Sequence, residues 1–231
     1  MTTITENGTI LEHQHFTGAV GAYMEHPDGR PYHTFRTASL MIFADHVTLR
    51  HCTVENTAGP DFGQAIALYL DGDDIVVEDC ILRGYQDTLF LAPLPPEPFE
   101  KDGFIGPKEF DERHRRTFTF RRCLIEGSID FIFGGATALF EECEFRSVAP
   151  GYVFAPCTPP DVKEGFVAKR CRFTCSENVP DQSCYIGRPW RENGHVRIED
   201  CTLGRHIHPD GWNDWGKDHN RIRFEGYPLP W

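Results

Sequence analysis

The stretch "EDCIL", Glu78 to Leu82, places a cysteine between charged residues and a strand-like continuation. The same arrangement occurs at five other places along the chain: "RHCTV" (Cys52), "RRCLI" (Cys123), "EECEF" (Cys143), "KRCRF" (Cys171) and "EDCTL" (Cys201). Successive cysteines of this set are 28, 43, 20, 28 and 30 residues apart. Apart from the interval of 43, these spacings are typical of one turn of a solenoid.

Apolar and polar side chains alternate around the cysteines, as in Val47, Leu49, Cys52 and Val54. Alternation with a period of two predicts strands, and hardly any segment has the periodicity of a helix. Short parallel strands stacked coil upon coil would place the six cysteines in one column of the core, as small apolar side chains. Leucine-rich repeats have a similar period, but their LxxLxLxxN line is absent. We therefore predict an all-β protein, a solenoid of the parallel β-helix type.

The cysteines also raise the alternatives of a disulfide scaffold and a zinc site. Their number, nine, is odd, and the chain is far longer than such scaffolds usually are. Cys171 and Cys175 form a close pair, but no second pair of matching spacing accompanies them. We expect reduced thiols and no metal site, and reduced thiols fit a cytosolic setting.

The composition describes a globular chain with an acidic surface. It has 231 residues, of which 40% are apolar, and its formal net charge is -12. This charge disfavours electrostatic binding of nucleic acid or of an anionic membrane. The first residues show no basic region followed by an apolar one, and no apolar run approaches the roughly 20 residues that span a bilayer. We expect a soluble protein, not exported as written, with no nucleic-acid or membrane partner.

One long interval in the repeat, from Cys80 to Cys123, contains "LAPLPPEPFEKDGFIGPKEFDERHRR". Its proline, glycine and charge predict a loop that leaves the solenoid and returns to it, at about residues 92–116. No linker or change of composition elsewhere divides the chain. We therefore predict a single domain of residues 1–231 with one loop insertion.

Two aspartates hold the same place in the repeat. Asp87 in "GYQDTLF" lies seven residues after Cys80, and Asp130 in "GSIDFIF" lies seven residues after Cys123. Neighbouring coils are about 4.8 Å apart, so we expect the two aspartates to face each other. Two carboxylates that close cannot both ionise comfortably, so one pKa should rise and the other stay low, giving a general acid and a nucleophile or base. The alternative is a pair of turn aspartates that only accept backbone hydrogen bonds, but the shared register and the apolar neighbours of Asp130 favour function.

Two glutamines and an arginine accompany this pair. Gln86 directly precedes the first aspartate, and Gln64 interrupts a run of small and apolar residues in "DFGQAIALYL". Two amides aimed at one point would suit the oxyanion of acyl transfer, although either glutamine alone also fits an internal ladder of a solenoid. Arg188 in "YIGRPW" precedes Pro189, which restricts its backbone to extended geometry. A guanidinium near Asp130 would keep that carboxylate ionised and oriented; the alternative is an ordinary surface ion pair.

Aromatic residues supply candidates for substrate binding. Trp190, Trp212 and Trp215 lie in loop-like sequence near glycines, and Tyr85 and Phe133 belong to the two aspartate motifs. Exposed aromatic faces are platforms for sugar rings, whereas buried indoles would cap a hydrophobic end of the solenoid. For each tryptophan taken singly, both alternatives stay open.

With these residues assembled, the chain resembles the pectin methylesterase family of carbohydrate esterases. The segments that match follow the family's order and cover about Tyr32 to Tyr227: "ENTAGP", "GQAIAL", "GYQDTLF", "GSIDFIFGGA", "YIGRPW" and "HPDGW". The resemblance implies a right-handed parallel β-helix with a surface cleft. It also implies roles for individual residues: Asp130 as nucleophile, Asp87 as general acid and then base, Gln64 and Gln86 as oxyanion donors, Arg188 as the residue that holds Asp130, and Trp190 and Trp212 in the sugar cleft.

Three features depart from the family's pattern. The family's helix and early coils before the equivalent of Tyr32 are mostly missing or altered, so we expect a solenoid shortened at its N-terminus. Gly135 stands where asparagine is common, which we expect to loosen the turn after Asp130. The insertion is longer than in the plant enzymes, and we expect it to roof or narrow the cleft.

The resemblance implies hydrolysis of galacturonate methyl esters in pectin or methylated oligogalacturonides, with no metal or cofactor. Two other classes stay open, a non-catalytic carbohydrate-binding or structural β-helix and a β-helical glycosidase or lyase. Pectin lies outside cells, so the cytoplasmic location expected from the sequence as written becomes extracellular if a leader was removed. The sequence does not set the oligomeric state.

Overall fold

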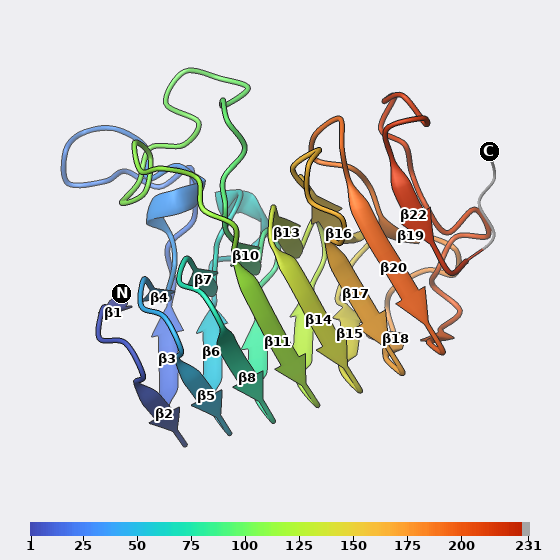
Figure 1. The fold of residues 1–231 in the computed structure, drawn as a ribbon, viewed down its shortest axis with the longest axis horizontal. Coiled ribbons are helices and arrows are strands. Elements are labelled where there is room, and N and C mark those ends of the chain that lie inside the picture. Colours follow the sequence, from blue (N-terminus) through green and yellow to red (C-terminus); the bar gives the residue numbers. More distant parts are fainter. Residues whose placement is uncertain (228–231) are drawn as a thin grey trace.

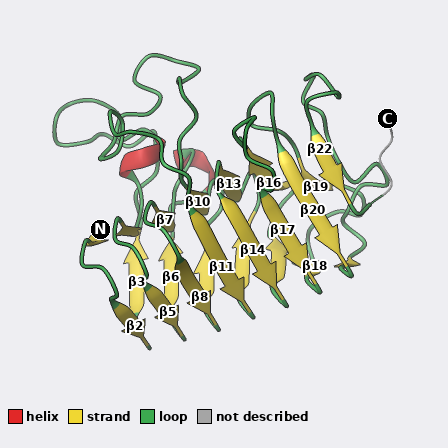
Figure 2. Cartoon of the chain, viewed as in Figure 1, coloured by secondary structure: helices red, strands yellow, loops and turns green. Residues whose placement is uncertain are grey.

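The strands of the chain wind into a parallel β-helix, as the cysteine repeat predicts (Figure 1). The computed structural model describes residues 1–227. Most coils add one strand to each of three sheets, all of whose pairings are parallel. Among the described residues the only helical segments are two short 3-10 turns, η1 (Thr34–Arg36) and η2 (Pro60–Phe62) (Figure 2). None of these helical segments is long and apolar enough to cross a membrane.

Each sheet is named here by a letter. Sheet A consists of β1 (Thr2–Ile4), β4 (Leu40–Ile42), β7 (Leu68–Leu70), β10 (Leu89–Leu91), β13 (Ile132–Gly134), β16 (Gly151–Pro156) and β19 (Cys184–Gly187). Sheet B consists of β2 (Ile10–Glu12), β5 (Thr48–Arg50), β8 (Ile75–Glu78), β11 (Thr117–Arg121), β14 (Thr137–Glu141), β17 (Phe166–Lys169), β20 (His195–Glu199) and β22 (Arg223–Glu225). Sheet C consists of β3 (His15–Gly18), β6 (Thr53–Asn56), β9 (Ile81–Arg83), β12 (Leu124–Gly127), β15 (Glu144–Ser147), β18 (Arg172–Cys175) and β21 (Thr202–Leu203).

The corner between sheets B and C turns at a single residue in the left-handed region. In six coils this residue directly precedes a cysteine of the repeat, and its φ lies between 51° and 55°: His51, Asp79, Arg122, Glu142, Arg170 and Asp200. In the first five of these coils its backbone N–H still donates to a carbonyl of the next coil, as from Asp79 to Arg121 at 3.0 Å. The hydrogen-bond ladder therefore continues round the corner while the chain changes direction.

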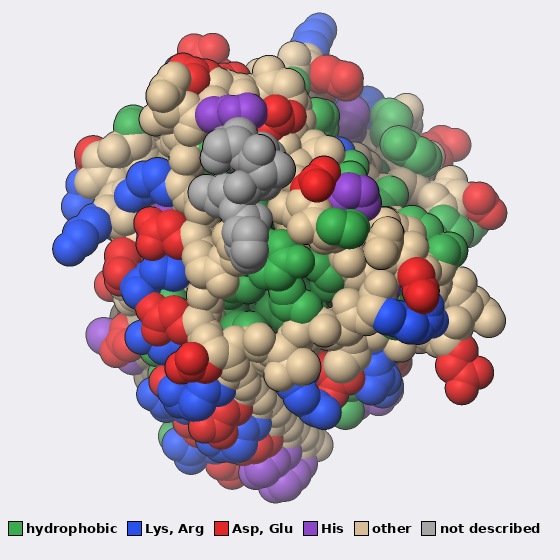
Figure 3. Space-filling model, turned by 90° about the vertical axis from the view of Figure 1, so that its right-hand side faces the viewer, with side chains coloured by type: hydrophobic (Ala, Val, Ile, Leu, Met, Phe, Trp, Pro, Cys, Tyr) green, Lys and Arg blue, Asp and Glu red, His purple; other side chains and the backbone are tan. Residues whose placement is uncertain are grey.

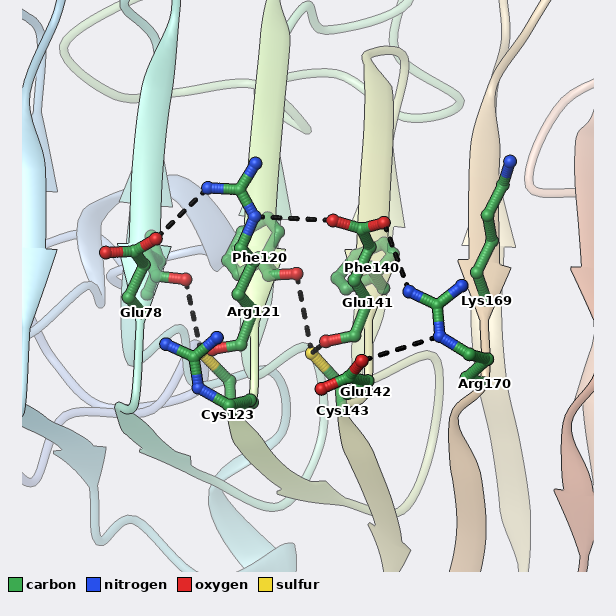
Figure 4. Close-up of polar contacts among 12 residues, drawn as sticks. Glu78, Phe120, Arg121, Cys123, Phe140, Glu141, Glu142, Cys143, Lys169 and Arg170 are labelled. Carbon is green, nitrogen blue, oxygen red and sulfur yellow. Dashed lines mark hydrogen bonds and ion pairs between the residues drawn. The ribbon is translucent and has the colours of Figure 1, made fainter.

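The cysteine side chains that follow this corner point into the core. Five of the six are at most 2% exposed, and Cys201 is partly buried. The thiol of Cys123 donates to the carbonyls of Val77 and Arg121, at 3.4 and 3.3 Å, and Cys143 repeats the arrangement one coil later (Figure 4). All nine cysteines are free. The predicted column of buried thiols is confirmed.

The outer face of sheet B is charged and solvated. Arg121 lies between Glu78 and Glu141, with nitrogen–oxygen distances of 3.1 and 3.3 Å, and Arg170 continues the ladder beyond Glu141 (Figure 4). Seen from the C-terminal end, side chains of both signs alternate along one flank of the molecule (Figure 3). Exposed pairs of this kind contribute little stability, so this face is a solvated wall.

Sheet A, by contrast, is apolar on both faces. The central residues of five consecutive strands are in register on its outer face and almost fully buried: Met41, Tyr69, Phe90, Phe133 and Ala155. Phe35, from η1, lies on this row with ring centroids 5.0 Å from Phe90 and 5.7 Å from Phe104 of the insertion. Two loops therefore cover sheet A and build walls above it (Figure 1).

The segment between β10 and β11, residues 92–116, contains no strand or helix and rises above sheet A (Figure 1). The N-terminal strands β1, β2 and β3 form a coil that pairs with β4, β5 and β6. The first residues thus continue the solenoid, and the cleft described next lies further along it.

Candidate active site

The two aspartates lie opposite each other on neighbouring coils. Leu89 of β10 pairs with Ile132 of β13, and the same offset of 43 residues sets Asp87 against Asp130. Both occupy the corner that enters sheet A, with φ of 62° and 50°, a conformation that aspartate tolerates better than most residues. The backbone N–H of Asp87 donates to the carbonyl of Ile129 at 3.0 Å. Their exposed fractions are only 8% and 9%.

Arg188 holds Asp130 by two parallel hydrogen bonds. Its Nε donates to Oδ1 at 2.8 Å and its Nη2 to Oδ2 at 2.7 Å. The guanidinium lies between the rings of Tyr152 and Trp215, 4.0 and 3.7 Å from their centroids. The backbone N–H of Arg188, which directly follows β19, donates to the carbonyl of Phe154 at 2.9 Å. Hydrogen bonds and stacking together fix the direction of the Asp130 carboxylate.

Burial raises the pKa of both aspartates, so the expectation that one of the two stays low is wrong. For Asp87, burial and then the nearby charge of Asp130 raise the pKa well above its usual value, and Arg188 opposes them. For Asp130, burial also raises the pKa, but the hydrogen bonds and charge of Arg188 oppose the rise. Asp87 makes no bond to the guanidinium, so its pKa rises further. Of the two carboxyls, that of Asp130 is therefore the more readily ionised.

The aspartates open onto a cleft of about 590 Å³, which is within the roughly 300–1,000 Å³ of ligand pockets. Gln64, Gln86 and Arg188 line it beside them. The backbone carbonyl of Gln64 accepts from Ala22 at 2.8 Å, and that of Gln86 accepts from Ala65 at 3.0 Å. Within the described part of the chain neither glutamine side chain forms a hydrogen bond, so the N–H groups of both amides are free for a ligand.

Three of the five aromatic candidates line the cleft: Phe133, Trp190 and Trp215. The rings of Phe133 and Trp190 meet edge to face with centroids 5.5 Å apart, and both belong to the wall. Tyr85 is half-buried and is not among the residues of the wall.

Trp212 does not reach the cleft. It is 1% exposed and its ring stacks on Phe224 with centroids 4.6 Å apart, so the buried alternative holds for this indole. Trp215, three residues later, is 42% exposed and forms the wall instead. Gly211 and Gly216, both with φ of 69°, bend the chain on either side of this pair. The two indoles of "GWNDWG" look alike in sequence, and only the turn decides which one faces inward.

The insertion contributes a wall that sequence reasoning did not resolve into residues. Its members in the cleft are Pro98, Phe99, Glu100, Gly103 and Phe104, and Arg191 faces them from the segment after β19. The proline and phenylalanine content of the insertion indicated a loop with apolar side chains. It did not indicate over which part of the solenoid this loop folds. Gly135 permits the close approach of the insertion's first residues, since a Cβ there would lie 2.8 Å from the carbonyl oxygen of Pro93. Its backbone N–H donates to Leu91 at 2.9 Å, so the turn after Asp130 is tightly packed, not loosened.

The arrangement suits acyl transfer. A buried carboxylate held by a guanidinium is a candidate nucleophile, a neighbouring carboxyl of higher pKa is a candidate acid, and two free amides are candidate oxyanion donors. Across residues 1–227 no group of three or more histidine, cysteine or acidic side chains is arranged to hold a metal ion.

A family model and the curated relatives of this chain indicate the same family. The family described as pectinesterase matches residues 14–93 and 111–223. Among curated proteins, the probable pectinesterase/pectinesterase inhibitor 23 of Arabidopsis thaliana is 31% identical over 195 residues, which cover 80% of this chain and 30% of that protein. The chain thus spans less than a third of the length of this relative.

Solved structures share the fold. A crystal structure of pectin methylesterase in complex with a hexasaccharide has a TM-score of 0.79 and 25% sequence identity, covering 97% of this chain and 75% of that one. The pectin methylesterase PemA from Erwinia chrysanthemi has a TM-score of 0.77 at 25% identity, with the same coverage. These likenesses confirm the expected right-handed parallel β-helix.

Proposed function

The chain belongs to the pectinesterase family, and from this premise we propose that it hydrolyses methyl esters of galacturonate units in pectin or its oligosaccharides, releasing methanol. The observation that carries the proposal is the pair of hydrogen bonds from Arg188 to Asp130. Asp87, on the adjacent coil, makes no such bonds, and its pKa is raised more strongly. It provides a carboxylate and a carboxylic acid on adjacent coils of one cleft.

In the first half-reaction, a carboxylate oxygen of Asp130 attacks the ester carbonyl carbon. The side-chain amides of Gln64 and Gln86 donate hydrogen bonds to the oxyanion that forms, and Asp87 gives its proton to the departing methoxide. Methanol leaves and an acyl-enzyme remains on Asp130. Loss of one oxyanion donor typically lowers turnover by about a hundred- to a thousandfold.

In the second half-reaction, the now ionised Asp87 accepts a proton from water. The resulting hydroxide attacks the acyl carbon, and collapse of the tetrahedral species returns Asp130 as carboxylate and releases the product as a galacturonic acid unit, which then loses its proton to water. Asp87 ends protonated, so the cycle closes with one water consumed. All the groups required are side chains of this chain, from the cleft described above.

Pectin-derived oligosaccharides are the substrate class that the comparisons favour. One similar solved structure is described as a pectin methylesterase in complex with a hexasaccharide. The half-buried Trp190 and the exposed Trp215 provide aromatic surface of the kind that contacts sugar rings. Since pectin lies outside cells, this substrate favours the extracellular location, and the comparisons lend no support to a cytoplasmic one.

The test is an assay of the purified protein on methylated oligogalacturonides of defined length, with methanol and new reducing ends measured in parallel. We expect methanol without new reducing ends. New reducing ends would indicate the glycosidase or lyase class instead. Binding of the oligosaccharide with neither product would indicate the non-catalytic class and overturn the proposal.

A further inference from the structure

Arg191 is a cation that lines the cleft. Its side chain is half-buried and lines the same wall as Trp190. Nη1 donates to the backbone carbonyl of Trp190 at 3.3 Å, and Nη2 donates to the carbonyl of Glu97 in the insertion at 3.1 Å. Among residues 1–227, no acidic side chain forms an ion pair with it, although Glu192 is its neighbour in sequence. Its other N–H groups have no partner among the described residues and are free for a ligand.

Two aromatic rings hold this guanidinium in place. Its central carbon lies 3.5 Å from the ring centroid of Phe99 and 4.6 Å from that of Trp190. Phe99 belongs to the insertion, and Trp190 to the segment after β19, so the guanidinium bridges the two sides of the cleft. A cation clamped by two rings and two carbonyls is pre-organised to receive an anion.

The charge balance around Arg191 favours an anionic ligand. Burial lowers its pKa, as expected for a cation removed from water without a counter-ion. Lys217, whose Nζ lies 4.7 Å from the ring centroid of Trp215, adds a second positive charge near Arg191, outside the cleft wall and with the charge of Glu192 beside it. The opposing carboxylate in the wall, Glu100, is exposed and forms no ion pair within the described chain.

Two of the residues that hold Arg191 lie outside the segments that match the family. The pectinesterase family matches residues up to 93 and again from 111, so Glu97 and Phe99 fall in the unmatched part of the insertion. The insertion therefore supplies part of the clamp, and Trp190 supplies the rest from a matched segment.

We propose that Arg191, clamped by the insertion, binds the free carboxylate of a galacturonate unit close to the methyl ester under attack. The enzyme then prefers esters that have a demethylated neighbour over fully methylated chains. This inference rests on the proposed function, because it concerns the same cleft.

The first test compares kcat/KM for methanol release from two trigalacturonates, one fully methylated and one with a single free carboxylate. We expect the wild-type protein to prefer the second by about tenfold or more, as for one charge-assisted bidentate contact. Arg191→Gln should bring the ratio close to one, and Arg191→Lys should keep part of it. A ratio that is the same in wild type and Arg191→Gln would overturn the proposal.

A matched pair of variants tests the clamp. Phe99→Ala should lower the preference by several-fold, because the guanidinium loses one of its two rings. Phe110→Ala removes a phenylalanine of the same insertion that is 91% exposed and lies outside the cleft wall, so the preference should stay as in wild type. Equal effects of the two substitutions would contradict the assigned role of Phe99.

A binding measurement separates this inference from the proposed function. Unmethylated trigalacturonate is titrated calorimetrically into the wild type and Arg191→Gln, with circular dichroism as the check on folding. We expect about tenfold weaker binding in the variant even if neither protein releases methanol. Methanol release by the wild type with unchanged binding in Arg191→Gln would leave the esterase intact and overturn the role of Arg191.

Discussion

At two corners of the solenoid, an aspartate in the left-handed region accepts hydrogen bonds from an arginine of another coil. At the corner before sheet C, Asp79 (φ 52°) accepts two hydrogen bonds from Arg122, both at 2.8 Å. At the corner before sheet A, Asp130 (φ 50°) accepts two from Arg188, at 2.8 and 2.7 Å. The bond geometry is nearly identical at the two corners.

The two pairs differ in their exposure to water. The side chains of Asp79 and Arg122 are 33% and 50% exposed, and those of Asp130 and Arg188 are 12% and 15% exposed. Hydrogen bonding to Arg122 lowers the pKa of Asp79, whereas burial raises the pKa of Asp130 despite Arg188. Removal from water therefore outweighs the arginine in setting the direction of the shift. The loops that cover sheet A remove Asp130 from water, and this burial raises its pKa.

The largest expected effect is on turnover. Asp130→Asn keeps a residue that tolerates positive φ but removes the proposed nucleophile, so kcat should fall by about 10⁴-fold or more. Asp79→Asn makes the same change at the exposed corner and should leave kcat as in wild type. Methanol release from a methylated oligogalacturonide measures both. Comparable rates in Asp130→Asn and wild type would show that this carboxylate is not the nucleophile.

The next effect is on stability. Arg188→Met leaves Asp130 buried without its partner, which should lower the free energy of unfolding by about 3–5 kcal/mol. Arg122→Met leaves Asp79 in contact with water, so the urea midpoint should move little. Urea unfolding of both variants, followed by circular dichroism at neutral pH, gives the comparison. Similar midpoints for the two variants would mean that burial does not distinguish the pairs.

The smallest expected effect is a difference of sign in the dependence of stability on pH. The pKa of Asp87 is raised in the folded state, so the ionised group opposes folding above its unfolded pKa of about 3.9, and less so as the pH falls. Asp87→Asn should therefore raise the melting temperature at pH 7 by about 2–4 °C, the shift that accompanies about 1 kcal/mol. This gain should vanish below about pH 4, where Asp87 is protonated in both states.

Asp79→Asn should show the opposite sign. The folded pKa of Asp79 is lowered, so its ionised form contributes stability above the unfolded pKa, and this contribution disappears as the pH falls through the folded value. The variant should be slightly less stable than wild type at pH 7 and equal to it in acid. Thermal melts of both variants between pH 3 and 7 measure the difference, and a common sign would contradict the effect of burial on Asp87.

Much of the fold and part of the site could be predicted from local sequence. The cysteine intervals predict the coils because each cysteine follows the one-residue corner that every coil needs. The equal offset of Asp87 and Asp130 predicts their facing positions, since strand register carries an offset from one coil to the next. Trp215 and Arg191 could not be found in this way, because loops outside the repeat have no register to count from.

The sequence by itself determined what repeats: parallel coils, a buried thiol column, and two aspartates aligned on adjacent coils. The tertiary structure alone decided which groups are withheld from water. The loops over sheet A bury Asp130 and Arg188 while Asp79 and Arg122 stay exposed, they turn Trp215 rather than Trp212 to the cleft, and they bring Phe99 onto Arg191. The physical reason is that strand pairing is set by short-range periodicity, whereas desolvation depends on every segment that packs above a site, however distant in the chain.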